Sequence, residues 1–158
     1  MVTRLLFVCL GNICRSPSAE NIMNHLIEQR QMENLIVCDS AGTSDYHIGR
    51  SPDVRMSAAA QQILGIVLKG RARQFHSADF EQFDLVLAMD RENYRSILAH
   101  DPAGRYREKV RLVCEFCRHH PDEEVPDPYY GEASGFQYVI NLLEDACEGL
   151  LEYILVQA

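Results

Sequence analysis

Cys9 and Arg15 are separated by five residues, one of which is Gly11. A loop of this length between a strand and a helix can turn its N–H groups toward one point and form a nest for an anion. The planar guanidinium of Arg15 matches two oxygens of a phosphate. The same positive field favours a thiolate at Cys9, and a thiolate beneath a bound phosphate is placed to attack phosphorus. We therefore expect Cys9 to be the nucleophile and Arg15 to bind phosphate together with the loop residues Leu10, Gly11, Asn12, Ile13 and Cys14.

A carboxyl group that could protonate a leaving group stands much later in the chain, at Asp127. Pro126 and Pro128 flank it and restrict the backbone of this segment. Departure of a phenolate from phosphorus needs a proton, and a carboxylic acid can supply it. Tyr129 and Tyr130 follow, and aromatic rings can form the walls of a slot for an aryl group. We predict that Asp127 is the general acid and base and that these tyrosines line the substrate pocket.

Apolar runs at 5–8, 35–38, 84–89 and 110–113 predict four strands. Helical spacing of apolar residues predicts helices over 17–30, 52–64, 90–101 and from 134 to near the C-terminus, with a short helix starting at Asp79. Strands that alternate with helices in this way are typical of a parallel sheet. The sequence therefore predicts a single doubly wound α/β domain over residues 1–158, with a four-stranded parallel sheet and helices on both faces.

Local signals predict where three of these helices begin and where one ends. Ser16 before Pro17 and Ser51 before Pro52 each have the cap-plus-proline order of a helix start. Asp90 is expected to be a structural N-cap rather than a second catalytic acid. Gly65 is expected to end the second helix.

Polar side chains are expected to gather at one edge of the sheet. Cys9 follows the first strand and Ser40 follows the second. Asp90 follows the third strand, and Asp127 lies in the loop after the fourth. Ligands of open α/β sheets bind outside the carboxyl ends of the strands, so this edge is the predicted site.

Composition restricts the class of partner. The chain has 158 residues, a formal net charge of −8 and six widely spaced cysteines. This charge disfavours nucleic acid and anionic membranes as partners, so an anionic substrate must be attracted by a local positive site at Arg15. The absence of a signal peptide or a membrane-spanning run, together with the scattered cysteines, predicts a cytoplasmic protein without a disulfide scaffold.

Two motifs together resemble the low molecular weight protein tyrosine phosphatase family: the segment Val-Cys-x-Gly-Asn-x-Cys-Arg-Ser at 8–16 and Asp-Pro-Tyr-Tyr-Gly at 127–131. Segments 40–43, 49–52, 71–74 and 89–93 also look like family segments in family order, so the resemblance covers nearly the whole chain. It implies hydrolysis of phosphotyrosine in proteins and of small aryl phosphates through a cysteinyl-phosphate intermediate. It implies no cofactor and no metal.

The resemblance also assigns supporting roles. Asn12 and Ser40 would hydrogen-bond to hold the phosphate loop in shape, and Ser16 would donate to the Cys9 sulfur. Leu10 and Tyr46 would form walls of the entrance. Gly70 is a departure, because many relatives carry at this position a His that helps to brace the loop asparagine.

Cys9 and Cys14 are expected to form a reversible disulfide after oxidation. An accessible thiolate is readily oxidised to a sulfenic acid, which a nearby thiol can capture. A loop wrapped around one phosphate brings its two ends close enough for such a bond.

Three alternatives remain open at this point. Thiol-dependent arsenate reductase resembles the same loop, but it needs relay cysteines, and no Cys occurs between Cys38 and Cys114. A phosphocysteine carrier subunit of a sugar transport system would need no acid such as Asp127. Cys114 and Cys117 with the histidines after them resemble half of a zinc site, although a buried cysteine at a strand end is the more common explanation.

Overall fold

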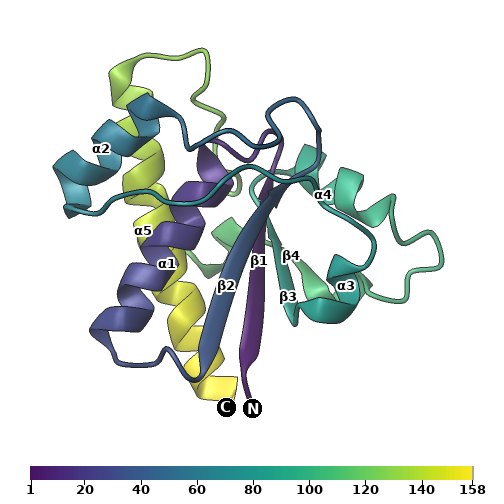
Figure 1. Ribbon diagram of the computed structural model, residues 1–158. Coiled ribbons are helices and arrows are strands. Elements are labelled where there is room, and N and C mark those ends of the chain that lie inside the picture. The colour runs from purple at the N-terminus through teal and green to yellow at the C-terminus, as the bar shows by residue number, and fades with distance from the viewer. Residues whose placement is uncertain (158) are drawn as a thin grey trace.

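The computed structural model describes residues 1–157 and contains a four-stranded sheet built around β1 (Thr3–Cys9). The strand order is β2-β1-β3-β4, and every neighbouring pair is parallel. Leu5, Leu6, Phe7 and Val8 are fully buried, as expected for a strand covered on both faces. The predicted α/β class and four-stranded parallel sheet are confirmed (Figure 1).

The remaining strands are β2 (Ile36–Gly42), β3 (Leu85–Ala88) and β4 (Val110–Leu112). The helices are α1 (Arg15–Gln29), α2 (Val54–Leu64), α3 (Asp79–Gln82), α4 (Arg91–Leu98) and α5 (Ala133–Gln157). Two short 3₁₀ turns, η1 (Arg107–Lys109) and η2 (Val113–Phe116), flank β4.

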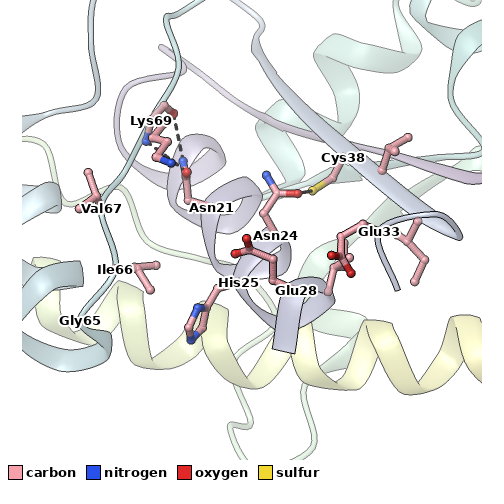
Figure 2. A pocket seen from close by; sticks show the side chains of 13 residues that line it. Asn21, Asn24, His25, Glu28, Glu33, Cys38, Gly65, Ile66, Val67 and Lys69 are labelled. Carbon is pink, nitrogen blue, oxygen red and sulfur yellow. Dashed lines mark hydrogen bonds between the residues drawn. The ribbon is translucent and has the colours of Figure 1, made fainter. Parts of the chain in front are cut away.

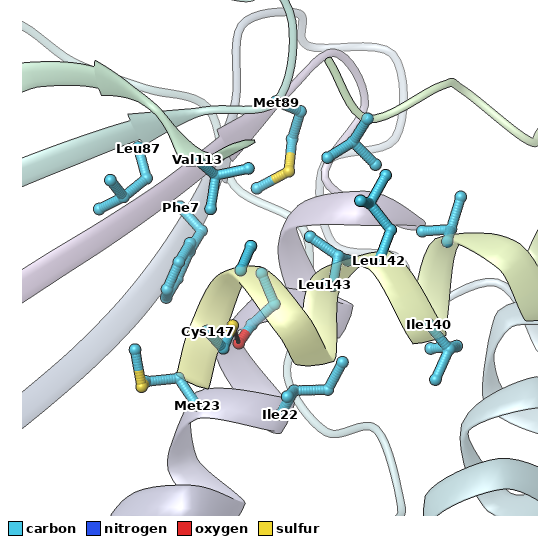
Figure 3. Packing of buried hydrophobic residues seen from close by; sticks show 14 of the residues in the cluster. Phe7, Ile22, Met23, Leu87, Met89, Val113, Ile140, Leu142, Leu143 and Cys147 are labelled. Atoms are coloured by element: carbon cyan, nitrogen blue, oxygen red, sulfur yellow. Dashed lines mark hydrogen bonds between the residues drawn. The ribbon is translucent and has the colours of Figure 1, made fainter. Parts of the chain in front are cut away.

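Helices cover both faces of the sheet. In Figure 1, α1, α2 and α5 lie on one face, and α3 and α4 lie on the other. Because successive strand residues point to opposite faces, β1 contributes side chains to two separate hydrophobic cores. Phe7 packs with residues of α1 and α5, whereas Leu6 and Val8 pack with Phe80 and Ile97. Figure 3 shows the larger core, in which side chains of the sheet meet those of α1 and α5.

Helix α5 fixes the start of the loop that leads to Asp127. The buried carboxylate of Asp145 accepts backbone N–H groups from Arg118, His119 and His120 at 2.9–3.1 Å. Burial alone would raise the pKa of Asp145, but these donors and the His120 ring lower it below its ordinary value.

Although α5 has 25 residues, no helix within residues 1–157 combines the length and apolarity needed to cross a membrane.

Two predicted helix starts are wrong. Ser16 is not a cap, because α1 already begins at Arg15 and the Ser16 hydroxyl bonds to the Cys9 sulfur instead. Ser51 does not cap α2 either, since Asp53 accepts the N–H groups of Arg55 and Met56.

Other local predictions fare better. Asp90 caps α4 by accepting the Asn93 N–H, and Gly65 ends α2 in the left-handed region at φ 67°. Helix α4 ends at Leu98, earlier than predicted. Strand β2 continues to Gly42, so Ser40 lies within it and not after it. As an edge strand, β2 can keep polar residues that a sequence pattern reads as the end of a strand.

The connections place the site at the edge predicted from the sequence. From β1 the chain goes to β2 on one side and then crosses back to β3 on the other. The carboxyl end of β1 is therefore the point at which the strand order reverses, and the loop carrying Cys9 begins there.

Candidate active site

The loop after β1 is held open by contacts of its carbonyl groups. The carbonyls of Cys9 and Leu10 accept from Thr43 and Ser44, and that of Ile13 accepts from Asp53. In contrast, the backbone N–H groups of Gly11, Ile13 and Cys14 find no acceptor within residues 1–157. Gly11, Ile13 and Cys14 line one cavity with Cys9, so their unsatisfied N–H groups are available to bind an anion there.

Asn12 gives the loop its turn. Its backbone lies in the left-handed region at φ 58°, which asparagine tolerates better than most residues. The buried Asn12 side chain donates to Ser16 Oγ and Ser40 Oγ at 2.8 and 3.0 Å. Its Oδ1 accepts the Arg73 N–H at 2.9 Å. Every polar atom of this side chain is thus used to fix the loop.

The sulfur of Cys9 lies at the floor of the loop and has two hydrogen-bond partners. The Ser16 hydroxyl is 3.0 Å from it, and the Asn12 backbone N–H donates to it at 3.3 Å. Donors of this kind stabilise a thiolate relative to a thiol. Cys9 is 2 % exposed, so a reagent reaches it only through the pocket above the loop.

Arg15 is buried, yet part of its guanidinium is unused. Nη1 donates to Asp90 Oδ2 at 2.7 Å and to the Val125 carbonyl at 3.0 Å. Nη2 lies 3.6 Å from Asp127 Oδ2, and Nε has no partner within residues 1–157. Burial alone would lower the pKa of Arg15, but the Cys9 sulfur, Asp90 and Asp127 outweigh burial and raise it. The guanidinium is therefore charged, fixed in place and ready to bind two oxygens of an anion.

Asp127 reaches the pocket from the loop between η2 and α5. Val125, just before it, is fully buried, and its N–H donates to the Met89 carbonyl at 2.8 Å. Asp127 Oδ1 accepts the Tyr129 N–H at 3.1 Å, while the side chain is 42 % exposed. The loop thus presents a partly solvated carboxyl group at the rim, near Arg15.

A cavity of about 120 Å³ opens above Cys9 and is lined by residues from three loops. It brings together most of the predicted site residues, namely Cys9, Leu10, Gly11, Ile13, Cys14, Arg15, Tyr46, Asp127, Tyr129 and Tyr130. Tyr129 and Tyr130 meet edge to face with centroids 4.8 Å apart. The predicted supports Asn12, Ser16 and Ser40 are hydrogen-bonded to one another and do not line the cavity.

The sequence matches the family model described as low molecular weight phosphotyrosine protein phosphatase across residues 4–157. The chain belongs to this family. It is therefore a protein-tyrosine phosphatase, a hydrolase class that needs no metal ion. The family and the reaction class expected from the sequence are confirmed.

Individual relatives agree over almost the whole chain. A low molecular weight protein-tyrosine-phosphatase of Synechocystis sp. is 60% identical over 148 residues, covering 94% of each protein. The crystal structure of a protein tyrosine phosphatase from Entamoeba histolytica matches with a TM-score of 0.94 at 42% identity, covering 98% of both chains. The crystal structure of YfkJ from Bacillus subtilis has a TM-score of 0.92 at 35% identity, covering 99% of this chain and 97% of that one.

Sequence reasoning missed three parts of the candidate active site. Asp90 was expected only as a helix cap, but it also holds Arg15. The carbonyl of Val125 fixes the same guanidinium, and no sequence pattern reports a backbone contact. His47 also lines the cavity, where its ring lies against Gly11 and 5.9 Å from the Tyr129 ring. Its position next to Tyr46 was the one available hint.

A larger groove of about 630 Å³ lies away from the phosphatase site, between α1, the start of β2 and residues 65–69. Figure 2 shows Asn24 bonded to Cys38 there, and Asn21 bonded to the backbone of Lys69. No residue of the phosphate loop lines this groove.

Cys114 lies in η2, and Cys117 follows this turn directly. All six cysteines are free thiols. Residues 1–157 contain no cluster of three or more His, Cys, Asp or Glu side chains placed to hold a metal ion.

Proposed function

We propose that this phosphatase hydrolyses phosphotyrosine in proteins, and small aryl phosphates, through a cysteinyl-phosphate intermediate on Cys9. The observation that carries the proposal is a set of donors without acceptors on residues that line one cavity with Cys9. Arg15 Nε and the N–H groups of Gly11, Ile13 and Cys14 have no acceptor within the described chain. Buried donors cost free energy when unpaired, so their presence beside a nucleophile supports binding of an anion with several oxygens.

In the first step the Cys9 thiolate attacks phosphorus in line with the bond to the phenolic oxygen. An S–P bond forms, the P–O bond breaks, and Asp127 gives its proton to the departing phenolate. Arg15 and the loop N–H groups hold the three equatorial oxygens as charge shifts onto them. No metal is required, because these donors stabilise the negative charge on the phosphate oxygens.

In the second step water hydrolyses the cysteinyl phosphate. Asp127, now a carboxylate, takes a proton from the attacking water, and the S–P bond breaks to release phosphate. Ser16 donates to the sulfur as it leaves and so stabilises the returning thiolate. Asp127 regains its proton, and the site is ready for another substrate.

The cavity walls predict a preference for phosphotyrosine over phosphoserine. Cys9 is buried in a cavity that the rings of His47 and Tyr129 also line, so a phosphate group must be carried by a long, flat side chain to reach it. We expect kcat/KM for a phosphoserine peptide to be at least about 100-fold lower than for the phosphotyrosine peptide of the same sequence. Release of phosphate from the two peptides measures this ratio, and similar values would refute the proposed pocket.

The same assay separates the two rival functions. An arsenate reductase would consume thiol with arsenate and release no phosphate from the peptide. A phosphocysteine carrier would accept one phosphate and stop. Repeated turnover on the phosphotyrosine peptide supports the proposed hydrolysis and excludes both.

We further propose that Cys14 protects Cys9 from irreversible oxidation. Peroxide converts the Cys9 thiolate to a sulfenic acid, and the Cys14 thiol then displaces water to form a disulfide. Both cysteines line the same cavity. Burial, and then Asp53, Cys9 and Asp127, raise the pKa of Cys14, so it is present as a thiol.

After mild peroxide and then thiol reductant, the wild-type protein should regain most of its starting activity, because the disulfide is reducible. Cys14→Ser should regain little, each protein being compared with its own activity before treatment. Mass spectrometry identifies the products. Sulfinic acid on Cys9 beside a free Cys14 thiol in the wild-type protein would rule out the disulfide.

A further inference from the structure

A chain of hydrogen bonds leads from the nucleophile to an acidic residue that the mechanism does not use. The Cys9 sulfur is 3.0 Å from Ser16 Oγ, which accepts from Asn12 Nδ2 at 2.8 Å. The same nitrogen donates to Ser40 Oγ at 3.0 Å. Ser40 in turn donates to Glu20 Oε1 at 2.6 Å, which is the shortest of these four hydrogen bonds. Ser16 and Glu20 are four residues apart on α1 and therefore share one face of the helix.

The Arg73 N–H and the Glu20 carboxylate determine which atoms donate and which accept in this series of hydrogen bonds. Asn12 Oδ1 accepts the Arg73 N–H, so Asn12 Nδ2 must be the donor toward both serines. Ser40 uses a lone pair to accept from Asn12, and its own proton is then free for the Glu20 carboxylate. Ser16 likewise accepts from Asn12, and its proton can go to the Cys9 sulfur at 3.0 Å or to the more distant Ala41 carbonyl at 3.4 Å.

We propose that Glu20 is a positioning residue of this phosphatase. As a carboxylate it accepts the Ser40 hydrogen bond, which fixes Ser40 as acceptor for Asn12 Nδ2. Together with the Arg73 N–H, this contact holds the Asn12 amide in the orientation that donates to Ser16 and leaves the Ser16 hydroxyl able to donate to the Cys9 sulfur. The inference rests on the proposed role of Cys9 as nucleophile. Glu20 acts through other side chains and does not touch the substrate.

The surroundings of Glu20 support this role, since it has no stronger interaction to make. Within residues 1–157 no cation lies in ion-pair contact with it, and Ser40 is the one hydrogen-bond donor to its carboxyl group. A small cavity of about 50 Å³ lies beside it, where Gly70 contributes no side chain. At this point the fold keeps a half-buried carboxyl group whose one partner belongs to the phosphate-loop network.

Charged groups face Glu20 from several elements. Asp39 on β2, with Arg73, Lys69 and Arg71 from the segment before α3, lie around it or line the adjoining cavity. Burial raises the pKa of Glu20 to about 7, the Ser40 hydrogen bond opposes this rise, Asp39 adds to it, and Arg73 opposes it. Near neutral pH the carboxylate and the carboxylic acid are therefore both populated.

The raised pKa of Glu20 means that its ionisation lowers the stability of the folded protein as pH rises. The folded state binds the Glu20 proton more tightly than the unfolded chain, so this group makes folding less favourable as pH rises from about 4.5 to above about 7. Removing the charge should therefore preserve or increase stability at pH 8. A group kept at a cost to folding, in contact with a catalytic network, fits a role in the reaction better than a role in the fold.

The test uses two variants that both remove the negative charge. Glu20→Gln keeps an oxygen that can accept from Ser40, whereas Glu20→Met does not. At pH 8, Glu20→Met should lower kcat/KM about 10-fold, as expected from one lost hydrogen bond that supports the thiolate. Glu20→Gln should stay within about 3-fold of wild type. Glu28→Met, an exposed position on the same helix, is the matched control and should behave as wild type.

Alkylation of Cys9 by iodoacetamide, followed across pH and assigned by mass spectrometry, reports on the thiolate without turnover. With Glu20→Met the midpoint of this pH curve should move upward, because the thiolate loses its ordered donor. A downward movement would mean that Glu20 acts only as a nearby negative charge, and an unchanged midpoint would also overturn the proposal. If Glu20→Met lowers the melting temperature at pH 8 as well as the activity, the role of Glu20 is merely structural and the proposal is overturned.

A double variant completes the test. Ser40→Ala should move the midpoint as Glu20→Met does, and combining the two should add nothing, because both break the same chain. Additive effects would overturn the proposal. Failure of Cys9 as nucleophile would appear separately, as turnover that survives alkylation of Cys9.

Discussion

Cys9→Ser is expected to abolish turnover of phosphotyrosine substrates, with a loss of more than about 10⁴-fold in kcat. A serine hydroxyl is a much weaker nucleophile than a thiolate, and the donors around position 9 cannot ionise it at neutral pH. The phosphate site itself should persist, since Arg15 and the loop N–H groups do not depend on the sulfur. The variant should therefore still bind phosphate-containing substrates without cleaving them.

Cys117→Ser is the matched control, because it makes the same substitution outside the cavity and should leave activity unchanged. Steady-state assays and binding of a phosphotyrosine peptide are measured on both proteins. Activity in clean Cys9→Ser protein would refute the covalent mechanism. Arg15→Ala is a less clean probe, because it leaves Asp90 unpaired at a buried contact and should also cost about 3–5 kcal/mol of stability.

Asp127→Asn should slow hydrolysis of phosphotyrosine by about 10²–10⁴-fold, the usual range for loss of general acid–base catalysis. Asparagine keeps the shape of the side chain and can still accept the Tyr129 N–H, so the loop should keep its conformation. The loss in the first step should shrink for aryl phosphates whose leaving groups are more acidic, because these need less protonation. A burst of phenol release followed by a slow phase would separate the first step from hydrolysis of the intermediate.

Two further variants make this prediction specific. Glu132→Gln removes an exposed carboxyl group nearby in the same loop and should have little effect. Asp90→Asn should reduce activity to the same extent with every leaving group, since Asp90 orients Arg15 and supplies no proton. If Asp127→Asn also loses activity equally across the series, Asp127 is structural and Asp90 becomes the candidate acid.

The positions of the residues proposed to carry the chemistry were predictable because local sequence encodes them. The loop from Cys9 to Arg15 needs a strand before it, a helix after it and a residue such as Asn12 that accepts a positive φ, and all three are visible in the chain. Asp127 was placed at the same edge by the rule that parallel strands present their carboxyl ends together. The structure brings this carboxyl group to within 3.6 Å of Arg15.

The supporting contacts were not predictable in the same way, because they join segments distant in sequence. The contact of Glu20 with Ser40 depends on how α1 is rotated over β2, and the contact of Arg15 with Asp90 depends on β3 lying next to β1. Ser16 was misread as a cap for a related reason. Its residue type suits both roles, and only the position of the Cys9 sulfur decides between them.

The proposed nucleophile and the proposed acid belong to parts of the fold that differ in local stability. The phosphate loop follows β1, which is paired on both sides, so exposing the amides of this strand to hydrogen exchange requires extensive unfolding. Beyond Val125, segment 126–132 hydrogen-bonds only to itself and to Gly135 within residues 1–157. Sub-global opening therefore withdraws Asp127 first and leaves a species that still captures phosphate esters. Such a partly open protein would still bind phosphate esters but would hydrolyse them slowly. Partial unfolding would therefore convert the hydrolase into a binding protein before the whole domain unfolds.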